Sequence, residues 1–309
     1  MKTGLLLLNK PTDMRSTKCV ELVRNKLGRK TKVGHGGTLD STASGLLIIL
    51  VGAATRLSNF VMDMQKSYET VACLGVETLT DDASGEIISR RGRENINEND
   101  IDMVLPSFFG WRMQAPPDVS AVHIDGRRAH ELARGGLEVH IEEKPVFFTS
   151  AARTSGISDE GKVSFCINCR KGTYIRSFVR DLGQLLGCGA HVSELKRSSC
   201  GPFELDNALD ASLLEHISKE DLLEKILPPE SVCPAATSYI CGVEDAERLI
   251  NGLHVPLYRL KRENFAEYSS TSGNIIVRSE KIFSICKFKD QGDPYVLLPA
   301  VNIINDRSN

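Results

Sequence analysis

A seven-residue loop, Gly34–Asp40, gathers several groups that could carry out chemistry. It holds three glycines together with His35, Thr38 and Asp40, and it lies between a basic stretch and an apolar one. Glycines allow a backbone to approach a ligand closely, and a carboxylate can act as nucleophile or base at a sugar carbon. The loop lacks the Lys-Ser/Thr pair of a phosphate-binding loop and the spacing of a dinucleotide fingerprint. A tight turn in which Asp40 caps the next element is the alternative.

A second group of polar side chains lies in Lys171–Arg176, where an alternating segment gives way to a helical one. Arg176 could pair with a catalytic carboxylate and keep it ionised, and Tyr174 could pack against a base. An ordinary surface arginine and a half-buried tyrosine are the alternative. Tyr68 opens another strand, and its ring could either pack in the core or stack on an extruded base.

The composition indicates a globular protein of two domains, since the chain has 309 residues, of which 41% are hydrophobic and 25% charged. The net charge of -2 gives no overall attraction to nucleic acid, so RNA binding would depend on local patches. The candidate patches are Arg24, Lys26, Arg29, Lys30 and Lys32; Arg127 and Arg128; and Arg170, Lys171, Arg176 and Arg180. Each patch could equally be a solvated surface.

The cysteines and the apolar runs bear on the compartment. The longest apolar run, residues 45–54, is too short to cross a membrane as a helix, which needs roughly 20 residues. Nine cysteines without a framework spacing indicate reduced thiols, and the N-terminus lacks a signal peptide, so we expect a cytoplasmic protein. Cys166 and Cys169 form a C-x-x-C, but an alternating strand directs their sulfurs to opposite faces, so we expect no metal site.

Hydrophobic periods predict the elements that hold these residues. Ser16 can cap a helix that ends at Gly28, and another helix carries Arg176 and Arg180 on its polar face. Residues 110–126 have two prolines and no clear period, which predicts a long surface loop before a short helix at 127–134. The other predictions are strands at 4–8, 46–51, 68–74, 145–155, 163–169 and 191–198, helices at 16–27, 53–62, 97–108, 175–186, 210–217 and 219–227, and a β-rich module from about 240.

Taken together and in this order, the segments resemble the TruB family of transfer-RNA pseudouridine-55 synthases. The resemblance covers about residues 4–204. Its motifs are Leu5–Pro11, Gly34–Asp40, Lys66–Gly75, Asp82–Gly85, Pro116–Ala121, Lys171–Arg176 and Leu186–His191. The family's reaction breaks an N-glycosidic bond, turns the uracil and joins it to the same sugar carbon. One carboxylate can serve this reaction, and the resemblance implies no metal and no organic cofactor.

The resemblance implies a fold of the α/β class. A mixed-sheet pseudouridine synthase catalytic domain with an inserted thumb would be followed by a small β-barrel RNA-binding module called PUA. In this chain the catalytic domain corresponds to residues 1–235, the thumb to about 110–145, and the PUA-like module to 236–309. Ile250–Val255 resembles the entry to that module.

The resemblance also assigns roles to single residues. The catalytic ones are Asp40, the essential aspartate; Tyr68, packed on the target base; Arg176, the partner of the aspartate; and Tyr174, its neighbour. The substrate- and RNA-binding ones are His35, at the flipped-out T-loop; Leu195, at the uracil pocket; and Lys10, Lys171, Arg180 and Arg127. The implied function is isomerisation of uridine 55 in the T-arm loop of tRNA by base flipping. We expect a monomer with no obligate protein partner and no membrane attachment.

Several positions depart from the family pattern. Asp13 stands in place of a glycine, Ser41 replaces a proline, and Arg15, Cys73, Val119, His123 and His130 also differ. They fall mainly on RNA-contact and supporting positions, so we expect them to affect RNA affinity, loop geometry and substrate range more than the reaction. Two rival functions are a non-catalytic tRNA-binding or tRNA-folding protein on the same scaffold, and a relative that works on ribosomal or small RNA in a guided complex.

Overall fold

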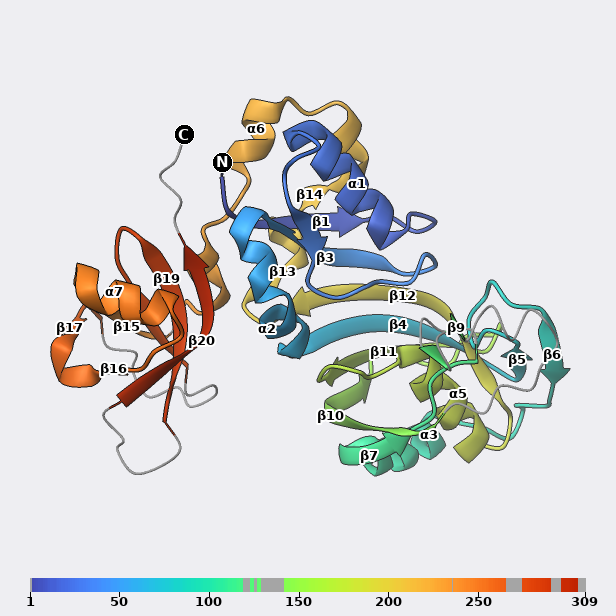
Figure 1. Ribbon diagram of the computed structural model, residues 1–309. Coiled ribbons are helices and arrows are strands. Elements are labelled where there is room, and N and C mark those ends of the chain that lie inside the picture. The colour runs from blue at the N-terminus through green and yellow to red at the C-terminus, as the bar shows by residue number, and fades with distance from the viewer. Residues whose placement is uncertain are drawn as a thin grey trace.

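The computed structural model describes residues 2–118, 142–234, 236–264, 274–289 and 296–304, and the backbone of 123–124 and 127–128. Two parts of the molecule, each built around its own sheet, lie side by side (Figure 1). Within the described ranges, no helix is long and apolar enough to cross a membrane. All nine cysteines are free, as the scattered spacing predicts.

A mixed sheet forms the core of the N-terminal part. Its strands are β1 (Gly4–Lys10), β2 (Val33–His35), β3 (Ser44–Val51), β4 (Lys66–Leu74), β7 (Gly110–Gln114), β10 (Lys144–Arg153), β11 (Lys162–Cys169), β12 (Ala190–Cys200), β13 (Phe203–Glu204) and β14 (Leu209–Asp210). The order is β14-β1-β3-β12-β4-β11-β10-β7, with β2 beside β3 and β13 beside β12. β14 is parallel to β1 and β12 to β3, while the other pairs are antiparallel. This confirms the expected mixed α/β sheet.

The middle strands follow directly from their sequences. β3 is a continuous apolar run and is buried on both faces, as a central strand must be. β4 alternates, so that Tyr68 and its even-numbered neighbours are buried while the odd-numbered side chains are more exposed. In the antiparallel register of β12 and β4, Arg197 lies opposite Tyr68, and Leu195 lies opposite Thr70. Opposed residues share a face, so these four side chains point to the same side of the sheet.

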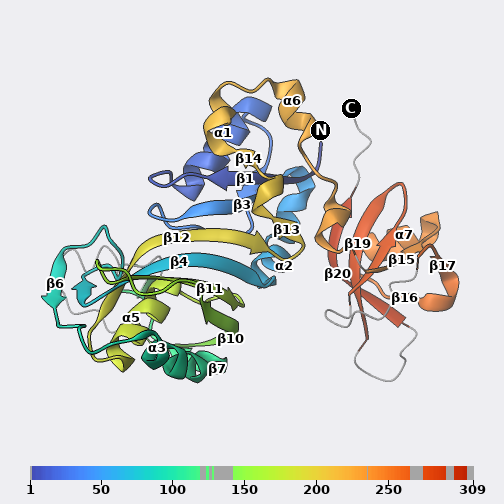
Figure 2. The same ribbon diagram turned by 180° about the vertical axis from the view of Figure 1, so that it is seen from behind.

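Two amphipathic helices pack on that side of the sheet at opposite ends (Figures 1 and 2). α1 (Ser16–Leu27) lies near β1, and α5 (Ile175–Leu185) lies near β11. Their buried residues recur at helical spacing, and Phe178 of α5 packs its ring against those of Phe108, Phe148 and Phe165. Both predicted helices are confirmed, and Gly28 ends α1 with a φ of 108°.

A second sheet forms the C-terminal part as a half-barrel. Its elements are β15 (Thr237–Ile240), α7 (Val243–Ile250), β16 (Val255–Pro256), β17 (Lys261–Arg262), β18 (Ile275–Arg278), β19 (Ile282–Phe288) and β20 (Val296–Ile304), in the strand order β16-β20-β19-β18-β15-β17. Leu46 and Ile48 of the large sheet pack with Phe283 and Ile303 of this module. The module therefore covers the β1–β3 half of the sheet on the face opposite α1 (Figure 2).

The remaining elements connect these two sheets. They are α2 (Ser58–Asp63), β5 (Val76–Thr78), β6 (Ile87–Arg90), α3 (Glu98–Val104), β8 (His123–Ile124), β9 (Arg127–Arg128) and α6 (Lys219–Glu224), with 3-10 turns at Gly52–Leu57, Leu105–Phe108, Leu205–Asn207, Ala211–Glu215, Pro229–Val232 and Leu257–Arg259. The helix predicted at 210–217 is thus only a 3-10 turn. Asn97 caps α3 through a reciprocal capping box.

The predicted loop at 110–126 is wrong at its start. Residues 110–114 form β7, the edge strand of the large sheet, paired with β10 from Gly110 opposite Phe148 to Gln114 opposite Lys144. The helix predicted from 127 is also wrong at its first residues, since Arg127 and Arg128 form β9, which pairs with β8. The rest of that predicted helix lies outside the described residues.

Candidate active site

Asp40 lies in a loop, residues 36–43, that a serine from α1 holds in place. The Ser16 hydroxyl accepts a hydrogen bond from the Leu39 N–H and donates one to the Leu39 carbonyl, both at 2.9 Å. The sequence predicts Ser16 as the helix cap, but the structure places it in the first turn of α1, and no side chain caps that helix. The serine instead fixes the residue next to Asp40, whose side chain is 42% exposed.

The departure at Asp13 keeps the local backbone geometry that a glycine would adopt. Asp13 has a φ of 64°, in the left-handed region where glycine costs nothing and aspartate is tolerated better than most residues. Its N–H donates to the carbonyl of Ser41, the other nearby residue that differs from the family pattern, at 2.8 Å. This bond connects the turn after β1 to the Asp40 loop. The change of residue type therefore leaves the path of the loop that carries Asp40 intact.

Arg176 reaches Asp40 from the first turn of α5. Its Nε lies 3.0 Å from Oδ2 of Asp40, and its NH1 donates to the Thr80 carbonyl at 2.9 Å. The arginine side chain is only 6% exposed. A buried guanidinium beside a half-exposed carboxylate keeps that carboxylate oriented toward the open side. The predicted pairing of these two residues is thus present.

Asp82 supplies a second carboxylate that sequence analysis did not assign to the site. Its Oδ2 lies 4.0 Å from NH1 of Arg176, and it accepts hydrogen bonds from Thr80 Oγ1 at 2.6 Å and from the N–H and hydroxyl of Ser84. Burial acts to raise its pKa, but the donors on Ser84 and Thr80 outweigh burial and lower the pKa of Asp82. Thr42 Oγ1 donates to Asp82 at 3.1 Å and ties it to the Asp40 loop.

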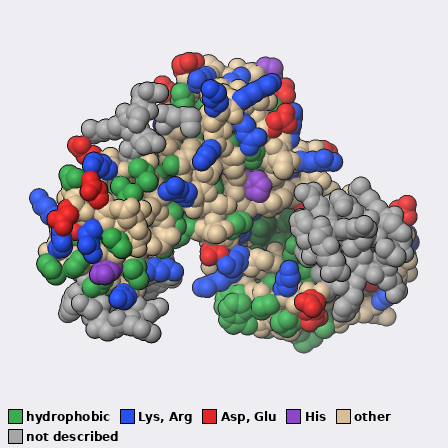
Figure 3. All heavy atoms as spheres, viewed as in Figure 1, with side chains coloured by type: hydrophobic (Ala, Val, Ile, Leu, Met, Phe, Trp, Pro, Cys, Tyr) green, Lys and Arg blue, Asp and Glu red, His purple; other side chains and the backbone are tan. Residues whose placement is uncertain are grey.

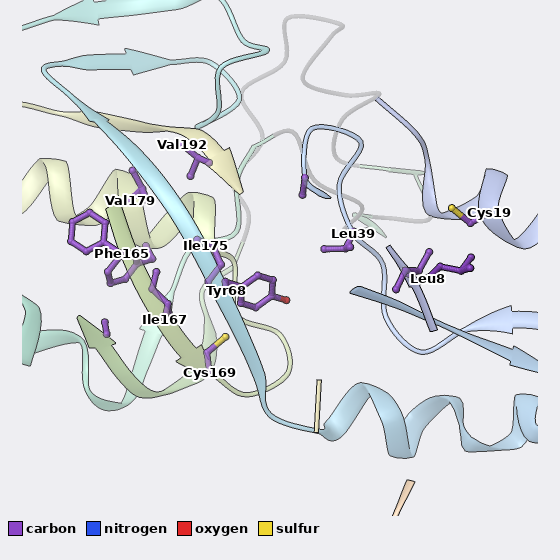
Figure 4. Packing of buried hydrophobic residues seen from close by; sticks show 14 of the residues in the cluster. Leu8, Cys19, Leu39, Tyr68, Phe165, Ile167, Cys169, Ile175, Val179 and Val192 are labelled. Atoms are coloured by element: carbon purple, nitrogen blue, oxygen red, sulfur yellow. The ribbon is translucent and has the colours of Figure 1, made fainter. Parts of the chain in front are cut away.

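Tyr68 lies at the bottom of the site with its hydroxyl toward the Asp40 loop (Figure 4). Leu39, the residue before Asp40 in this loop, lies on the side of the Tyr68 ring to which the hydroxyl points. The hydroxyl is hydrogen-bonded with Arg197, another buried cation that sequence analysis missed. Nε of Arg197 donates to the Leu46 carbonyl at 2.7 Å and NH2 to the Gly37 carbonyl at 3.3 Å. One guanidinium therefore links the tyrosine, the Asp40 loop and β3.

Tyr68→Phe is expected to remove an alkaline loss of stability. Burial, opposed by Arg197, raises the pKa of Tyr68 from 10.0 to about 12. Below pH 10 the phenol is protonated in folded and unfolded chains alike, whereas between pH 10 and 12 mainly the unfolded chain ionises, so wild type loses roughly 2 kcal/mol by pH 12. The free energy of urea unfolding should decline less steeply in the variant over this window. Parallel curves for the two proteins would contradict it, and Tyr258→Phe, on an exposed side chain, serves as control.

His35 and Leu195 border the same site. His35 ends β2, where its Nδ1 accepts the Gly37 N–H at 3.4 Å, and burial followed by the charge of Arg197 lowers its pKa. The imidazole is therefore neutral near pH 7. Leu195 is half-buried on β12 and packs against the core that contains Tyr68. Figure 3 shows a hollow in the surface here, between the part that carries β1 and β3 and the part that carries β10 and β11.

Tyr174 stands immediately before α5 and is held by its backbone. Its N–H donates to Oε1 of Gln114 at 2.9 Å, and its carbonyl accepts from Nε2 of Gln114 at 3.1 Å. The side chain is half-buried, and burial, followed by the charge of Asp40, raises the pKa of its phenol. The phenol is therefore neutral beside Asp40 at neutral pH.

Lys10, which the resemblance assigns to RNA binding, is engaged within the protein. Its side chain is completely buried, and its ammonium donates to the carbonyls of Pro11, Met14 and Ala43 at 2.5–2.9 Å. These three bonds use all the donors of a lysine. The residue instead closes the strand-to-helix connection beneath the Asp40 loop.

The other predicted RNA-binding cations have different surroundings. Arg180 is engaged within the protein, since it pairs with Asp81 at 3.0 Å and with Asp181 at 2.9 Å, which argues against its assigned role. Lys171 is exposed and pairs with the exposed Asp63, an arrangement that solvent screens strongly and that a phosphate could replace. Arg127 lies in β9, and its side chain is outside the described part.

Solved structures with a related fold cover almost the whole chain. One, described as a Cbf5-Nop10-Gar1 complex, matches with a TM-score of 0.68 at 22% identity, covering 96% of this chain and 84% of that one. Another, an H/ACA RNP bound to a substrate RNA containing 2'-deoxyuridine, also has a TM-score of 0.68, with 19% identity over 99% of this chain and 86% of that one. At these identities the likeness concerns the fold alone.

Sequence comparisons are more specific. The family model of the TruB family pseudouridylate synthase N-terminal domain matches residues 24–175, and that of the tRNA pseudouridylate synthase B C-terminal domain matches 176–233. The tRNA pseudouridine synthase B of Ectopseudomonas mendocina is 42% identical over 73% of this chain and 74% of its own length, and that of Dinoroseobacter shibae is 37% identical over 87% of each. Fold and sequence together define a pseudouridine synthase, an isomerase. The chain belongs to the TruB family.

Proposed function

We propose that this chain converts uridine 55, in the T-arm loop of tRNA, to pseudouridine. The observation that carries the proposal is the pair of Asp40 and Arg176, 3.0 Å apart, with the carboxylate open to solvent and the guanidinium buried. Relatives named tRNA pseudouridine synthase B share 37–42% of their residues with most of this chain. The chemistry of that reaction needs one oriented carboxylate at a sugar carbon, which is what this arrangement offers.

The base must leave its stack before Asp40 can reach it. A flipped uridine placed in the hollow would lie on the Tyr68 ring, with Leu195 bordering the base. The buried, neutral phenol offers an apolar surface rather than a charge, so the uracil can turn on it after the N-glycosidic bond breaks. The neutral His35 at the end of β2 would contact the rest of the flipped loop.

The carboxylate of Asp40 acts as nucleophile or base, and its neighbours hold it in a fixed orientation. Arg176 balances its charge from below, and Asp82 in turn fixes Arg176. The N-glycosidic bond breaks and a ring carbon of the uracil forms a bond to the same sugar carbon. That ring carbon loses its proton and the freed ring nitrogen gains one, so atoms and electrons balance without another reactant. We propose a monomer as the working unit. Its nine free thiols agree with action in the cytoplasm.

We also propose that residues 236–309 act as a PUA-like RNA-binding module. The half-barrel sheet of this region has its own apolar core, which includes Leu249, Val277 and Leu297. Its apolar contact is with the face of the large sheet opposite the one that carries Tyr68. The module could therefore hold one part of a tRNA while another part occupies the site.

A conversion assay tests the proposed function. Purified protein is incubated with an unmodified tRNA transcript in the presence of a chelator, and pseudouridine is mapped along the RNA. We expect pseudouridine at position 55, and no product at that position from a transcript in which uridine 55 is replaced by cytidine. Wild-type protein that binds the transcript but leaves every uridine unchanged would contradict the enzyme and favour a non-catalytic tRNA-binding protein.

A further inference from the structure

A row of aromatic and cationic side chains, exposed except for the half-buried Phe147, crosses the end of the large sheet. Trp111 of β7 lies directly opposite Phe147 of β10, and their ring centroids are 5.2 Å apart. Arg170, just beyond β11, donates its N–H to the Phe147 carbonyl and places its guanidinium 5.4 Å from the centre of the Phe147 ring. These three residues, with the exposed Met113 beside them, are called the β7–β10 platform below.

The platform faces outward because of the alternation in β7 and β10. Val146 and Phe148, on either side of Phe147, are buried in the core that contains Tyr68, so Phe147 points to the other face. Trp111 is 70% exposed although it is the only tryptophan of the chain. In Figure 3 hydrophobic side chains gather over β7 and β10, facing the notch that separates this end from the C-terminal module.

We propose that the β7–β10 platform binds unpaired nucleotides of the tRNA substrate that lie outside the target loop. The inference rests on the proposed function and adds a second contact to it. Aromatic rings and guanidinium planes on the open face of a sheet are a common stacking surface for unpaired bases. Here Trp111, Phe147 and Arg170 supply three planar groups in one row. The platform lies on the sheet face opposite Tyr68, so it would hold different nucleotides from those held at Asp40.

The platform is connected to the active site through short, well-fixed segments. β7 runs from Trp111 to Gln114, about 10 Å along the strand, and Gln114 holds the backbone of Tyr174 through two hydrogen bonds. Arg170 begins the segment that continues through Tyr174 to Arg176. An RNA held at both places would therefore contact one rigid unit.

The charges around the platform are mixed in sign. We therefore expect RNA binding there to depend on base stacking more than on electrostatic attraction to phosphates. Lys171 next to Arg170 is exposed, and its pairing with Asp63 at 2.5 Å is open to solvent, so a phosphate can compete for it. Lys144 is exposed at the start of β10, but Glu142 and Glu143, also exposed, precede it. A stacking contact with one nearby cation fits this mixed environment better than a long run of phosphates does.

The single tryptophan gives a direct test. Tryptophan emission of the Asp40→Asn protein is followed during titration with full-length unmodified tRNA and with an isolated T-arm hairpin. We expect quenching that saturates with the tRNA but not with the hairpin. Trp111→Ala and Phe147→Ala should each weaken tRNA binding in filter assays by about tenfold, the scale of one lost base–aromatic contact. Met103→Ala, which removes a 73%-exposed apolar side chain of α3, should change neither result.

Three outcomes would overturn the platform as an RNA site. They are unchanged emission at saturating tRNA, equal quenching by the hairpin, and emission that depends on protein concentration without RNA, which would indicate pairing of two copies through edge strand β7. None of them affects formation of pseudouridine by wild type. Failure of the conversion assay, in contrast, contradicts the proposed function whatever the emission does.

Discussion

Asp40→Asn is expected to lower the rate of pseudouridine formation by at least about four orders of magnitude, the scale seen when other enzymes lose a nucleophile or its base. An amide keeps the shape of the side chain but cannot attack carbon or accept a proton at neutral pH. Binding of tRNA should persist, because the hollow and Tyr68 are unchanged. Single-turnover conversion and filter binding of the same transcript measure the two effects separately.

The matched control is Glu69→Gln, an equally conservative change at an exposed carboxylate paired with Lys196. It should leave the rate and the affinity as in wild type. If Asp40→Asn converted uridine at a rate near that of wild type, the chemistry would have to lie elsewhere, and Asp82 would be the next carboxylate to replace. Loss of tRNA binding together with loss of rate would mean that Asp40 serves binding rather than the reaction.

The pairing of Asp40 with Arg176 could be predicted from sequence because each residue lies in a compact motif of unusual composition. A glycine-rich loop ending in a carboxylate and an arginine at a helix start are both visible locally, and their order along the chain matches a known family. The supporting residues have no such local signal. Arg197 binds the Leu46 carbonyl, 151 positions away, and only the register of β12 against β4 brings it to Tyr68.

Lys10 shows the reverse error. A lysine next to a proline at the end of a strand is exposed by default, because burying an ammonium costs several kcal/mol unless it is fully hydrogen-bonded. Three carbonyls from the turn after β1 and from the Asp40 loop provide those bonds. Their convergence is a property of the folded loops and could not be read from residue spacing.

The edge strand β7 could not be predicted because the residues around it are typical of a loop. Trp111 and Met113 alternate with Arg112, but a glycine begins the segment and two prolines follow it closely, which is typical of a loop. Residues 110–114 form a strand because they pair with β10, and an edge strand needs a partner on one side only. Alternation is also hard to recognise when Arg112 stacks on Phe108 and so behaves as an inward-facing residue.

Arg176→Met is expected to lower the rate roughly a thousandfold and to destabilise the fold by about 3 kcal/mol, because a buried charge partner is removed. Asp40 loses the group that orients it, and the buried Asp82 loses its nearest cation. Arg176→Lys should fall between wild type and the methionine variant, since an ammonium keeps the charge but not the planar set of donors. Urea unfolding and single-turnover conversion measure the two losses.

A double variant separates the structural part of this effect from the catalytic part. Adding Asp82→Asn to Arg176→Met removes the negative charge that faced the lost guanidinium at 4.0 Å, and Thr80 and Ser84 can still donate to the remaining amide oxygen. Stability should therefore be partly recovered, while Asp40 still lacks its partner and the rate should stay low. Arg153→Met, which removes the arginine of a pair with Asp102 far from the hollow, controls for the loss of any one ion pair and should leave the rate unchanged. Recovery of both stability and rate in the double variant would contradict a role for Arg176 in orienting Asp40, since the single variant would then have acted through the fold alone.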